Sequence, residues 1–287
     1  MMRSIDSRVD QTLARLLPRV EADLNRVFPS GVTEVLVEFL VFGIKQAWAC
    51  LFGGLLLLGM ISTRYFYPES LALARYDFLV LYAVVIQVTF LLTRLERPSE
   101  ALVILIFHAV GTAMEVFKTD AGSWIYPEEN LLRIGGVPLF SGFMYAAVGS
   151  YFARVARVFE LRWRSYPGLG VTLLLAAFIY VNFFSHHFIW DFRFGLFAMT
   201  AAVFWRTTVY FRVWRWQHQM PLLIGFFLVS VFIWIAENIA TFTAIWLYPV
   251  QEEGWHMVPL QKLGSWYLLM IISWVLVTLV HRPKPAD

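Results

Sequence analysis

The sequence predicts an all-α integral membrane protein: eight transmembrane helices form two parallel four-helix repeats, both termini are cytoplasmic, and an N-terminal amphipathic helix lies at the membrane surface. Three observations lead to this prediction. Of the 287 residues, 59% are hydrophobic and only 15% are charged, an apolar excess that one globular core could not bury. Eight apolar segments have about the length of a membrane span. One motif also occurs twice, in the same register.

Composition excludes several other classes of protein. The isoelectric point near 9.0 would fit a polyanionic ligand, but the arginines are spread over short loops, so we expect no nucleic-acid partner. The single cysteine, Cys50, lies in an apolar run, which leaves no internal disulfide and no cysteine metal cluster. The first 30 residues lack the apolar core of a secretory signal peptide, so we expect no cleaved leader.

Residues 1–35 are predicted to form a cytoplasmic or interfacial segment. Between residues 4 and 28, leucines and valines recur at helical spacing opposite arginines, and Pro18 is expected to bend the helix. This amphipathic helix lies either on the membrane surface or against the cytosolic side of the protein. The sequence favours neither alternative.

Eight apolar segments follow, and prolines such as Pro68, Pro98, Pro167 and Pro221 mark their joins. At 1.5 Å per helical residue, each covers most or all of a hydrocarbon core of about 30 Å. The predicted spans are 39–61, 77–94, 99–119, 137–157, 169–186, 193–211, 221–242 and 259–280.

The distribution of basic residues predicts the orientation of these spans. With the N-terminus inside, most arginines fall in cytoplasmic segments, whereas the opposite loops hold only Arg64, Arg75, Arg133 and Arg193, with Lys118 and Lys262 at their membrane borders. The sequence therefore predicts a multi-pass protein of the bacterial cytoplasmic membrane. The lipid bilayer is its first expected partner.

The spans divide into two halves, 36–158 and 159–287, with four predicted crossings each. An even number of crossings returns the chain to its starting side, so both halves have the same orientation, as in a parallel repeat. Asp77 and Asp191 each open the second span of their half, and Pro98 and Pro221 open the third.

The duplicated motif ends the third span of each half and enters an outer loop. The two copies lie 122 positions apart, and Val-Pro-Leu follows each of them, at 137–139 and at 258–260. The shared residues are Glu115, Thr119, Trp124, Tyr126 and Pro127 in the first copy, and Glu237, Thr241, Trp246, Tyr248 and Pro249 in the second.

The two glutamates are the main candidate catalytic residues. An unpaired charged carboxylate about one turn inside the membrane is costly, so each must be protonated, paired or in contact with water. In the structural interpretation, each glutamate anchors its own outer loop through the Trp or Tyr donors and the Thr one turn later. In the functional interpretation, the two carboxylates meet across a pseudo-twofold axis and move protons.

Further polar residues are candidates for the same outer site. His108 lies two turns before Glu115 on one helix face, either as a proton relay or as a packed core histidine. The neighbouring pair His186 and His187 could in principle bind a transition metal, but adjacent side chains on a helix point about 100 degrees apart. We therefore predict no metal site. The other candidate binding residues are His186, His187, Asp191, Asn238, His256 and Lys262.

Two resemblances to known families rest on these motifs. Residues 111–119, 122–127, 136–145, 234–238 and 262–266 closely resemble a bacterial membrane family known only as domain of unknown function 817. The chain also resembles, more faintly, the membrane lycopene cyclases and carotenoid hydratases, in which carboxylates protonate a polyene. The cyclases have two acidic residues just after the turn proline. Here Leu139-Phe140 and Leu260-Gln261 stand there, so the likeness implies that Glu115 or Glu237 would be the acid.

Two functions of different classes follow. One is an enzyme that acts on a lipophilic, isoprenoid- or carotenoid-like substrate by carboxylate acid–base chemistry at an outward-facing site. The alternative is a proton- or cation-coupled carrier that uses Glu115 and Glu237 at the repeat interface. An enzyme needs a long apolar pocket, whereas a carrier needs polar groups reaching both sides. A structural or sensory protein is a third possibility, and the sequence indicates no particular cofactor.

Overall fold

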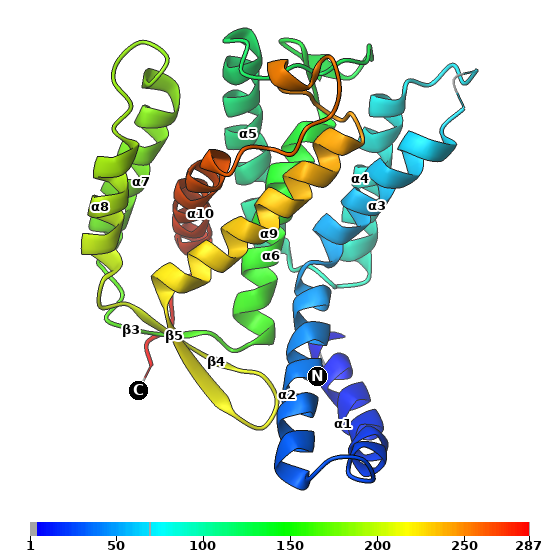
Figure 1. Ribbon diagram of the computed structural model, residues 1–287, viewed down its shortest axis with the longest axis vertical. Helices are drawn as coiled ribbons and strands as arrows, with labels where there is room; N and C mark the ends of the chain where they lie inside the picture. Colours follow the sequence, from blue (N-terminus) through cyan, green and yellow to red (C-terminus); the bar gives the residue numbers. More distant parts are fainter. Residues whose placement is uncertain (1–4, 69, 287) are drawn as a thin grey trace.

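The computed structural model describes residues 5–68 and 70–286. This part of the chain is mostly helical, and its long helices run between two ends of an elongated bundle (Figure 1). The helices are α1 (Ile5–Leu24), α2 (Ser30–Ala49), α3 (Leu51–Phe66), α4 (Arg75–Leu92), α5 (Pro98–Asp120), α6 (Phe140–Val158), α7 (Leu169–Ser185), α8 (Arg193–Phe204), α9 (Leu222–Phe242) and α10 (Gln261–Val280).

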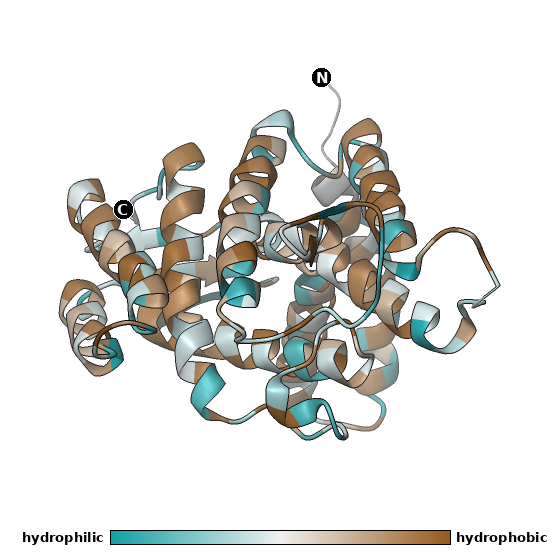
Figure 2. Ribbon diagram, turned by 90° about the horizontal axis from the view of Figure 1, so that it is seen from above, coloured by the Kyte–Doolittle hydropathy of each residue, from teal (hydrophilic) through white to brown (hydrophobic). Residues whose placement is uncertain are grey.

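Four of the described helices are long and apolar enough to cross a membrane: α4, α5, α9 and α10. The bent pair α2–α3 makes a fifth at most, and α7 and α8 are apolar but shorter. Seen along the bundle in Figure 2, hydrophobic residues make up much of the long helices. Large side chains such as Phe39, Leu105 and Phe232 are exposed on their surface. Apolar surface of this extent is typical of a protein surrounded by lipid.

The first predicted span, 39–61, is not one straight helix. It divides into α2 and α3, which meet at Cys50 with a bend of 69°. Gly53 and Gly54 follow the bend and lower the helical preference there, since glycine loses the most backbone entropy in a helix. The bend lets α2 pack on α1 and α6, while α3 turns to pack on α4 and α6.

The sixth predicted span, 193–211, is wrong in its second half. Helix α8 ends at Phe204, and strand β4 (Thr208–Arg212) pairs with β3 (Arg162–Arg164) and β5 (Gln217–Pro221) in an antiparallel sheet at the lower end of Figure 1. A run of β-branched and aromatic residues from Thr207 to Phe211 favours strand over helix. Hydropathy cannot separate the two for a short apolar run. The expectation of an all-α chain is therefore corrected.

The N-terminal helix forms, but it is shorter than predicted. α1 runs from Ile5 to Leu24 with Pro18 inside it, and Leu13 and Leu17 are buried against the hydrophobic core. The predicted residues 1–4 lie outside the described chain. The buried leucines show that one face of α1 packs on the protein itself.

The hairpin of α5 and α6 is the closest helix pairing near the predicted site, and glycines make it possible. A Cβ atom at Gly111 would lie 2.5 Å from the Tyr145 ring, and one at Gly142 would lie 2.3 Å from the His108 ring. Two short strands, β1 (Arg133–Ile134) and β2 (Val137–Pro138), order the loop between the helices. This loop and the one joining α9 to α10, which contains η1 (Pro249–Gln251), lie at the same upper end of the bundle (Figure 1).

Candidate functional site

Glu115 is held by the loop that follows it, between α5 and α6. Its carboxylate is buried, and Oε2 accepts hydrogen bonds from Trp124 Nε1 at 2.8 Å and from the Tyr126 hydroxyl at 2.7 Å. Oε1 accepts a third, at 2.7 Å, from the hydroxyl of Tyr145 on α6. Burial, and next the Glu115 carboxylate, raise the pKa of Tyr126 well above its usual range, so this phenol stays a donor. Charge-assisted bonds of this kind are among the strong ones in proteins.

Glu237 is held in a related way with one donor fewer. Its buried carboxylate accepts from the hydroxyl of Tyr248 through Oε1 and, at 2.7 Å, from Trp266 Nε1 through Oε2. Trp246 lies next to the Tyr248 hydroxyl and not against the carboxylate. The two copies therefore use the same glutamate and tyrosine, but a different tryptophan.

Tyr145 and Trp266 are the two donors that the sequence reasoning missed. Each lies eight residues after the valine of its Val-Pro-Leu element, Val137 or Val258, so they occupy corresponding positions of the two copies. The signal was present as spacing. It was missed because the residue types differ, although a phenol and an indole both donate a hydrogen bond.

The two motif tails are joined directly to each other. The backbone N–H of Ile125 donates to the carbonyl of Leu247, and that of Leu247 donates back to Ile125, both at 2.9 Å. These residues lie 122 positions apart, as the two glutamates do. The rings of Trp124 and Tyr248 meet edge to face, with centroids 6.1 Å apart. Corresponding positions of the two copies thus pair reciprocally.

Lys262 connects the two carboxylate clusters. Its ammonium lies 4.3 Å from the centroid of the Tyr248 ring and 5.9 Å from that of Trp124, in the range of cation–π attraction. The two glutamates are also close enough for the charge of Glu237 to act on Glu115. One cation and two acidic groups therefore belong to a single electrostatic unit at this end of the bundle.

The start of α4 supplies a further anchor that was not predicted. Arg75 donates at 2.8 Å to the carbonyl of Thr243 and pairs with Glu128 at 2.5 Å, which ties both motif loops to one side chain. The hydroxyl of Tyr76 donates at 2.9 Å to the carbonyl of Ile245. These bonds connect the α4 start and both motif loops into one layer at this end of the bundle.

The predicted bonds from threonine to glutamate do not form. Thr119 Oγ1 is buried without a hydrogen-bond partner among the described residues, and Thr241 donates to the carbonyl of Asn238 while accepting from Trp255. The aromatic donors already occupy the carboxylate oxygens, which explains the difference. The side chain of Asn238 accepts the backbone N–H of Val258 at 2.9 Å and so holds the second loop.

His108 lies between α5 and α6 beside Gly142 and packs edge to face on Phe143, with centroids 4.9 Å apart. The backbone of Gly142 lies within hydrogen-bonding reach of this imidazole, whereas Thr112 Oγ1 and Ser141 Oγ are buried without a hydrogen-bond partner among the described residues. Its role as a relay to Glu115 stays a prediction, since no hydrogen bond joins the two in the described structure. These unpaired polar atoms all lie on the α5–α6 hairpin.

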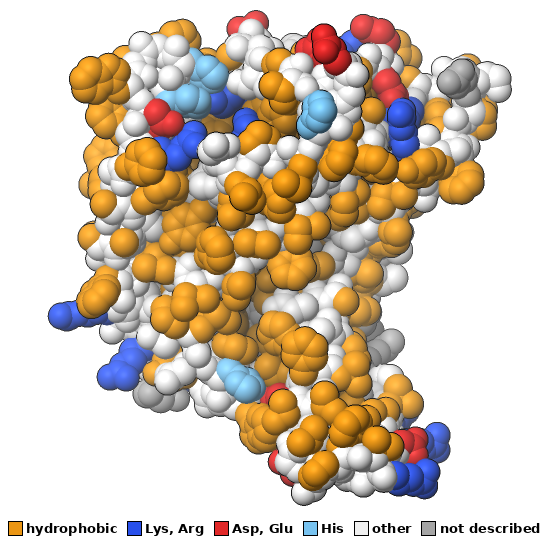
Figure 3. Space-filling view, viewed as in Figure 1, with side chains coloured by type: hydrophobic (Ala, Val, Ile, Leu, Met, Phe, Trp, Pro, Cys, Tyr) orange, Lys and Arg blue, Asp and Glu red, His pale blue; other side chains and the backbone are white. Residues whose placement is uncertain are grey.

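The predicted residues His186 and His187 lie around Lys118, which the sequence predicts only to stand at a membrane border. Lys118 Nζ lies 2.7 Å from Nε2 of His187 and 3.3 Å from Nε2 of His186. Figure 3 shows blue and pale-blue side chains together at the upper left, over the α7–α8 connection. Asp191 pairs there with Arg193 at 3.2 Å. His256 is exposed, and its carbonyl accepts a bond from Gln251, so the structure does not bring it into this cluster.

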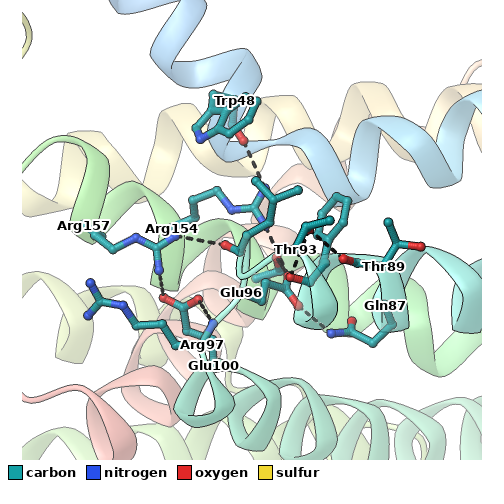
Figure 4. A network of polar contacts seen from close by, with 12 residues as sticks. Trp48, Gln87, Thr89, Thr93, Glu96, Arg97, Glu100, Arg154 and Arg157 are labelled. Carbon is teal, nitrogen blue, oxygen red and sulfur yellow. Dashed lines mark hydrogen bonds and ion pairs between the residues drawn. The ribbon is translucent and has the colours of Figure 1, made fainter. Parts of the chain in front are cut away.

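A second buried polar network lies near the opposite end (Figure 4). Glu96 lies 3.4 Å from Arg154, and both side chains are 1% exposed. Glu96 also accepts from Ser150 and Gln87, both at 2.5 Å, and Arg154 donates to the carbonyl of Trp48 at 3.2 Å. Nearby, Arg157 pairs with Glu100, which in turn accepts the backbone N–H of Arg97 at 2.8 Å. The helix bundle therefore has a charged layer at each end.

Acidification is expected to weaken the Lys118–His187 contact. Partial burial, and then the charges of Lys118, His186 and Lys262, hold the pKa of His187 below its usual value. The unfolded chain therefore binds the proton first as the pH falls below about 6.5, and the stability that the neutral imidazole contributes is lost. Thermal unfolding from pH 7.5 to 5 should show the difference between wild type and His187→Gln shrinking. A constant difference would contradict this.

Comparisons with known proteins agree with the resemblance seen in the sequence. The model of the protein family of unknown function DUF817 matches residues 38–274. The uncharacterized protein YoaT of Bacillus subtilis (strain 168) is 42% identical over 243 residues, which cover 85% of this chain and 91% of YoaT. Neither match is to a carotenoid enzyme, so that fainter likeness stays a prediction. No solved structure matches significantly. The chain therefore belongs to the DUF817 family, whose function is unknown.

Proposed function

We propose that this chain is a multi-pass carrier of the bacterial cytoplasmic membrane that moves a lipophilic small molecule and couples this movement to protonation of Glu115 and Glu237. The observation that carries the proposal is that each buried glutamate accepts hydrogen bonds from aromatic side chains of the loop that follows it. An ionised carboxylate accepts all these bonds. A protonated carboxyl group must itself donate a hydrogen bond through its O–H, so at least one of the hydrogen bonds from the aromatic donors has to change. Protonation would thus loosen the outer end.

The topology proposed for the carrier is that of the sequence analysis: eight crossings in two parallel halves, 36–158 and 159–287, with both termini cytoplasmic. The reciprocal bonds between Ile125 and Leu247 support an axis between the halves. The four outer connections lie at one end of the bundle, and the sheet β3–β5 lies at the other (Figure 1). For the short helices α7 and α8 to cross, the bilayer would have to be thinner around them.

Polar groups between the two charged layers favour a carrier over an enzyme. Thr112 and Ser141 have buried hydroxyls without a protein partner among the described residues; Thr112 lies one turn before Glu115 on α5, and Ser141 lies in the first turn of α6. Buried polar atoms of this kind are normally satisfied by water or by a ligand. Below them, Ser150 and Arg154 on α6 belong to the inner network.

The enzyme remains the second candidate because of the groups beside Glu237. Lys262, His186 and His187 supply an ammonium and two imidazoles on the same outer side, as acid–base chemistry requires. Both oxygens of Glu115 already accept hydrogen bonds, so this carboxylate would have to break one of them to protonate a substrate.

The experiment compares a strain lacking this gene with the same strain expressing wild type, Glu115→Gln, Glu237→Gln or the double variant. Glutamine preserves the size of the side chain and much of its hydrogen bonding but cannot be protonated at neutral pH. A carrier predicts an unchanged lipophilic compound with altered distribution across the membrane, whereas an enzyme predicts a substrate that accumulates while its product disappears. The exposed Glu253→Gln is the matched control. Full complementation by both single variants and by the double variant would refute a role for either carboxylate.

A further inference from the structure

Lys118 is a buried cation without an acidic partner of its own. It lies in the last turn of α5 and is 4% exposed, and its ammonium contacts the two imidazoles and lies 4.3 Å from the centroid of the Phe183 ring. Among the described residues no carboxylate lies within ion-pair distance of it. The C-terminal end of a helix favours a positive charge, which accounts for part of its stability. Burying an ammonium nonetheless calls for a counter-charge.

Two more cations surround the same point. Lys262 lies in the first turn of α10 and Arg193 begins α8, and both act electrostatically on Lys118. The nearby acidic groups are already engaged, Asp191 with Arg193 and Glu237 with two aromatic donors. The third acidic group at this end, Glu115, accepts three aromatic hydrogen bonds, so none of these carboxylates pairs directly with Lys118. The lowered pKa of His187, to which the charges of Lys118 and Lys262 contribute after burial, is consistent with a positive field there.

The surface next to this cluster is aromatic and exposed. On the α7–α8 connection Phe188 is 78% exposed and Trp190 is 85% exposed, and the ring of Phe188 contacts that of His187. Tryptophan is enriched at the level of lipid head groups, and the Phe188 ring adds apolar surface beside it. A molecule bound here would meet cations with its polar end and apolar rings with its chain.

We propose that Lys118, Lys262 and His187 bind the phosphate-monoester head group of an amphiphile, while His186 contacts Lys118 from the protein side. The proposal rests on the proposed function, because it names the class of the lipophilic molecule that the protein handles. The ammonium groups of Lys118 and Lys262 and the Nδ1–H of His187, whose Nε2 accepts from Lys118, offer several donors on this side of the protein, which suits a doubly charged oxyanion better than a monoanion. The phosphate could equally be supplied by free inorganic phosphate, and the experiment separates the two sources.

The test titrates the purified full-length protein in neutral detergent micelles at pH 7.5 with dodecyl phosphate, inorganic phosphate and dodecyltrimethylammonium, and measures dissociation constants by tryptophan fluorescence. Wild type should bind dodecyl phosphate and not the cationic amphiphile. Lys118→Gln should weaken binding about 10- to 100-fold, as expected for loss of hydrogen bonds to a charged group. Binding of inorganic phosphate as tight as that of dodecyl phosphate would overturn the amphiphile in favour of the free ion.

Two further variants guard against misfolding of Lys118→Gln. The half-buried Lys262→Gln should also weaken binding, whereas Lys284→Gln, which removes one positive charge at the opposite end of the protein, should leave it unchanged. Equal binding by wild type, Lys118→Gln and Lys262→Gln would overturn the site. This binding test is independent of transport: intact binding together with full complementation by the glutamate variants would refute coupling through Glu115 and Glu237 and leave the phosphate site standing.

Discussion

Replacing Glu115 with leucine is expected to lower the free energy of unfolding by about 3 to 5 kcal/mol, since each buried donor left without a partner costs about 1 to 3 kcal/mol. Three donors lose their acceptor at once: Trp124, Tyr126 and Tyr145. The phenols can partly reorient, so the three costs do not add fully. Unfolding in mixed micelles, followed by circular dichroism, measures the difference.

Variants at the other glutamate rank the effects. Glu237→Leu leaves two donors unpaired, so it should cost less than Glu115→Leu. Glu115→Gln should cost about 1 kcal/mol or less, because the amide oxygen can still accept from Trp124 and Tyr126 while its NH2 group donates to the hydroxyl of Tyr145. Two results would show that the hydrogen bonds from aromatic donors to the glutamates do not hold the loops. One is a Glu115→Leu protein as stable as wild type, and the other is a larger loss of stability in Glu237→Leu than in Glu115→Leu.

The duplicated motif predicts from sequence that two similar loops lie at the same end of the protein, and the roles of their residues stay predictions. The spacing from Glu115 to Pro127 equals that from Glu237 to Pro249, so the two loops are expected to begin in the same way. In the structure the two loops pair with each other at Ile125 and Leu247. A comparison of identical residues between the two copies does not find corresponding positions that hold different residue types with the same hydrogen-bonding capacity. Tyr145 and Trp266 share only the ability to donate a hydrogen bond, so a search for identical letters passes over them.

The predicted spans 39–61 and 193–211 differ from the structure because hydropathy does not determine backbone conformation. Residues 193–211 are apolar throughout most of their length, but helix gives way to strand after Phe204 because the strand residues find partners in segments far along the chain. The bend at Cys50 is a similar case, since both sides of it are helical and apolar. Tertiary pairing decides such boundaries, and a single sequence holds only a weak trace of it.

Replacing Arg154 with methionine is expected to be about as destabilising as Glu115→Leu, at about 3 to 5 kcal/mol, because it leaves a buried carboxylate without its cation. Glu96 would keep its bonds from Ser150 and Gln87, but its charge would stay in a site that is 1% exposed. The same micelle unfolding measurement applies. Arg212→Met, which removes one partner of an exposed pair with Glu160, is the matched control and should change stability by less than about 1 kcal/mol.

The double variant Glu96→Met/Arg154→Met separates charge from packing. Replacing a whole buried ion pair with apolar side chains is often neutral, so the double variant should recover most of the stability that Arg154→Met loses. Recovery should be incomplete, since Gln87, Ser150 and the carbonyl of Trp48 each lose a partner. If the double variant were no more stable than Arg154→Met, the loss would come from the packing of the arginine, whose guanidinium lies 5.0 Å from the centroid of the Phe90 ring, and not from an isolated charge.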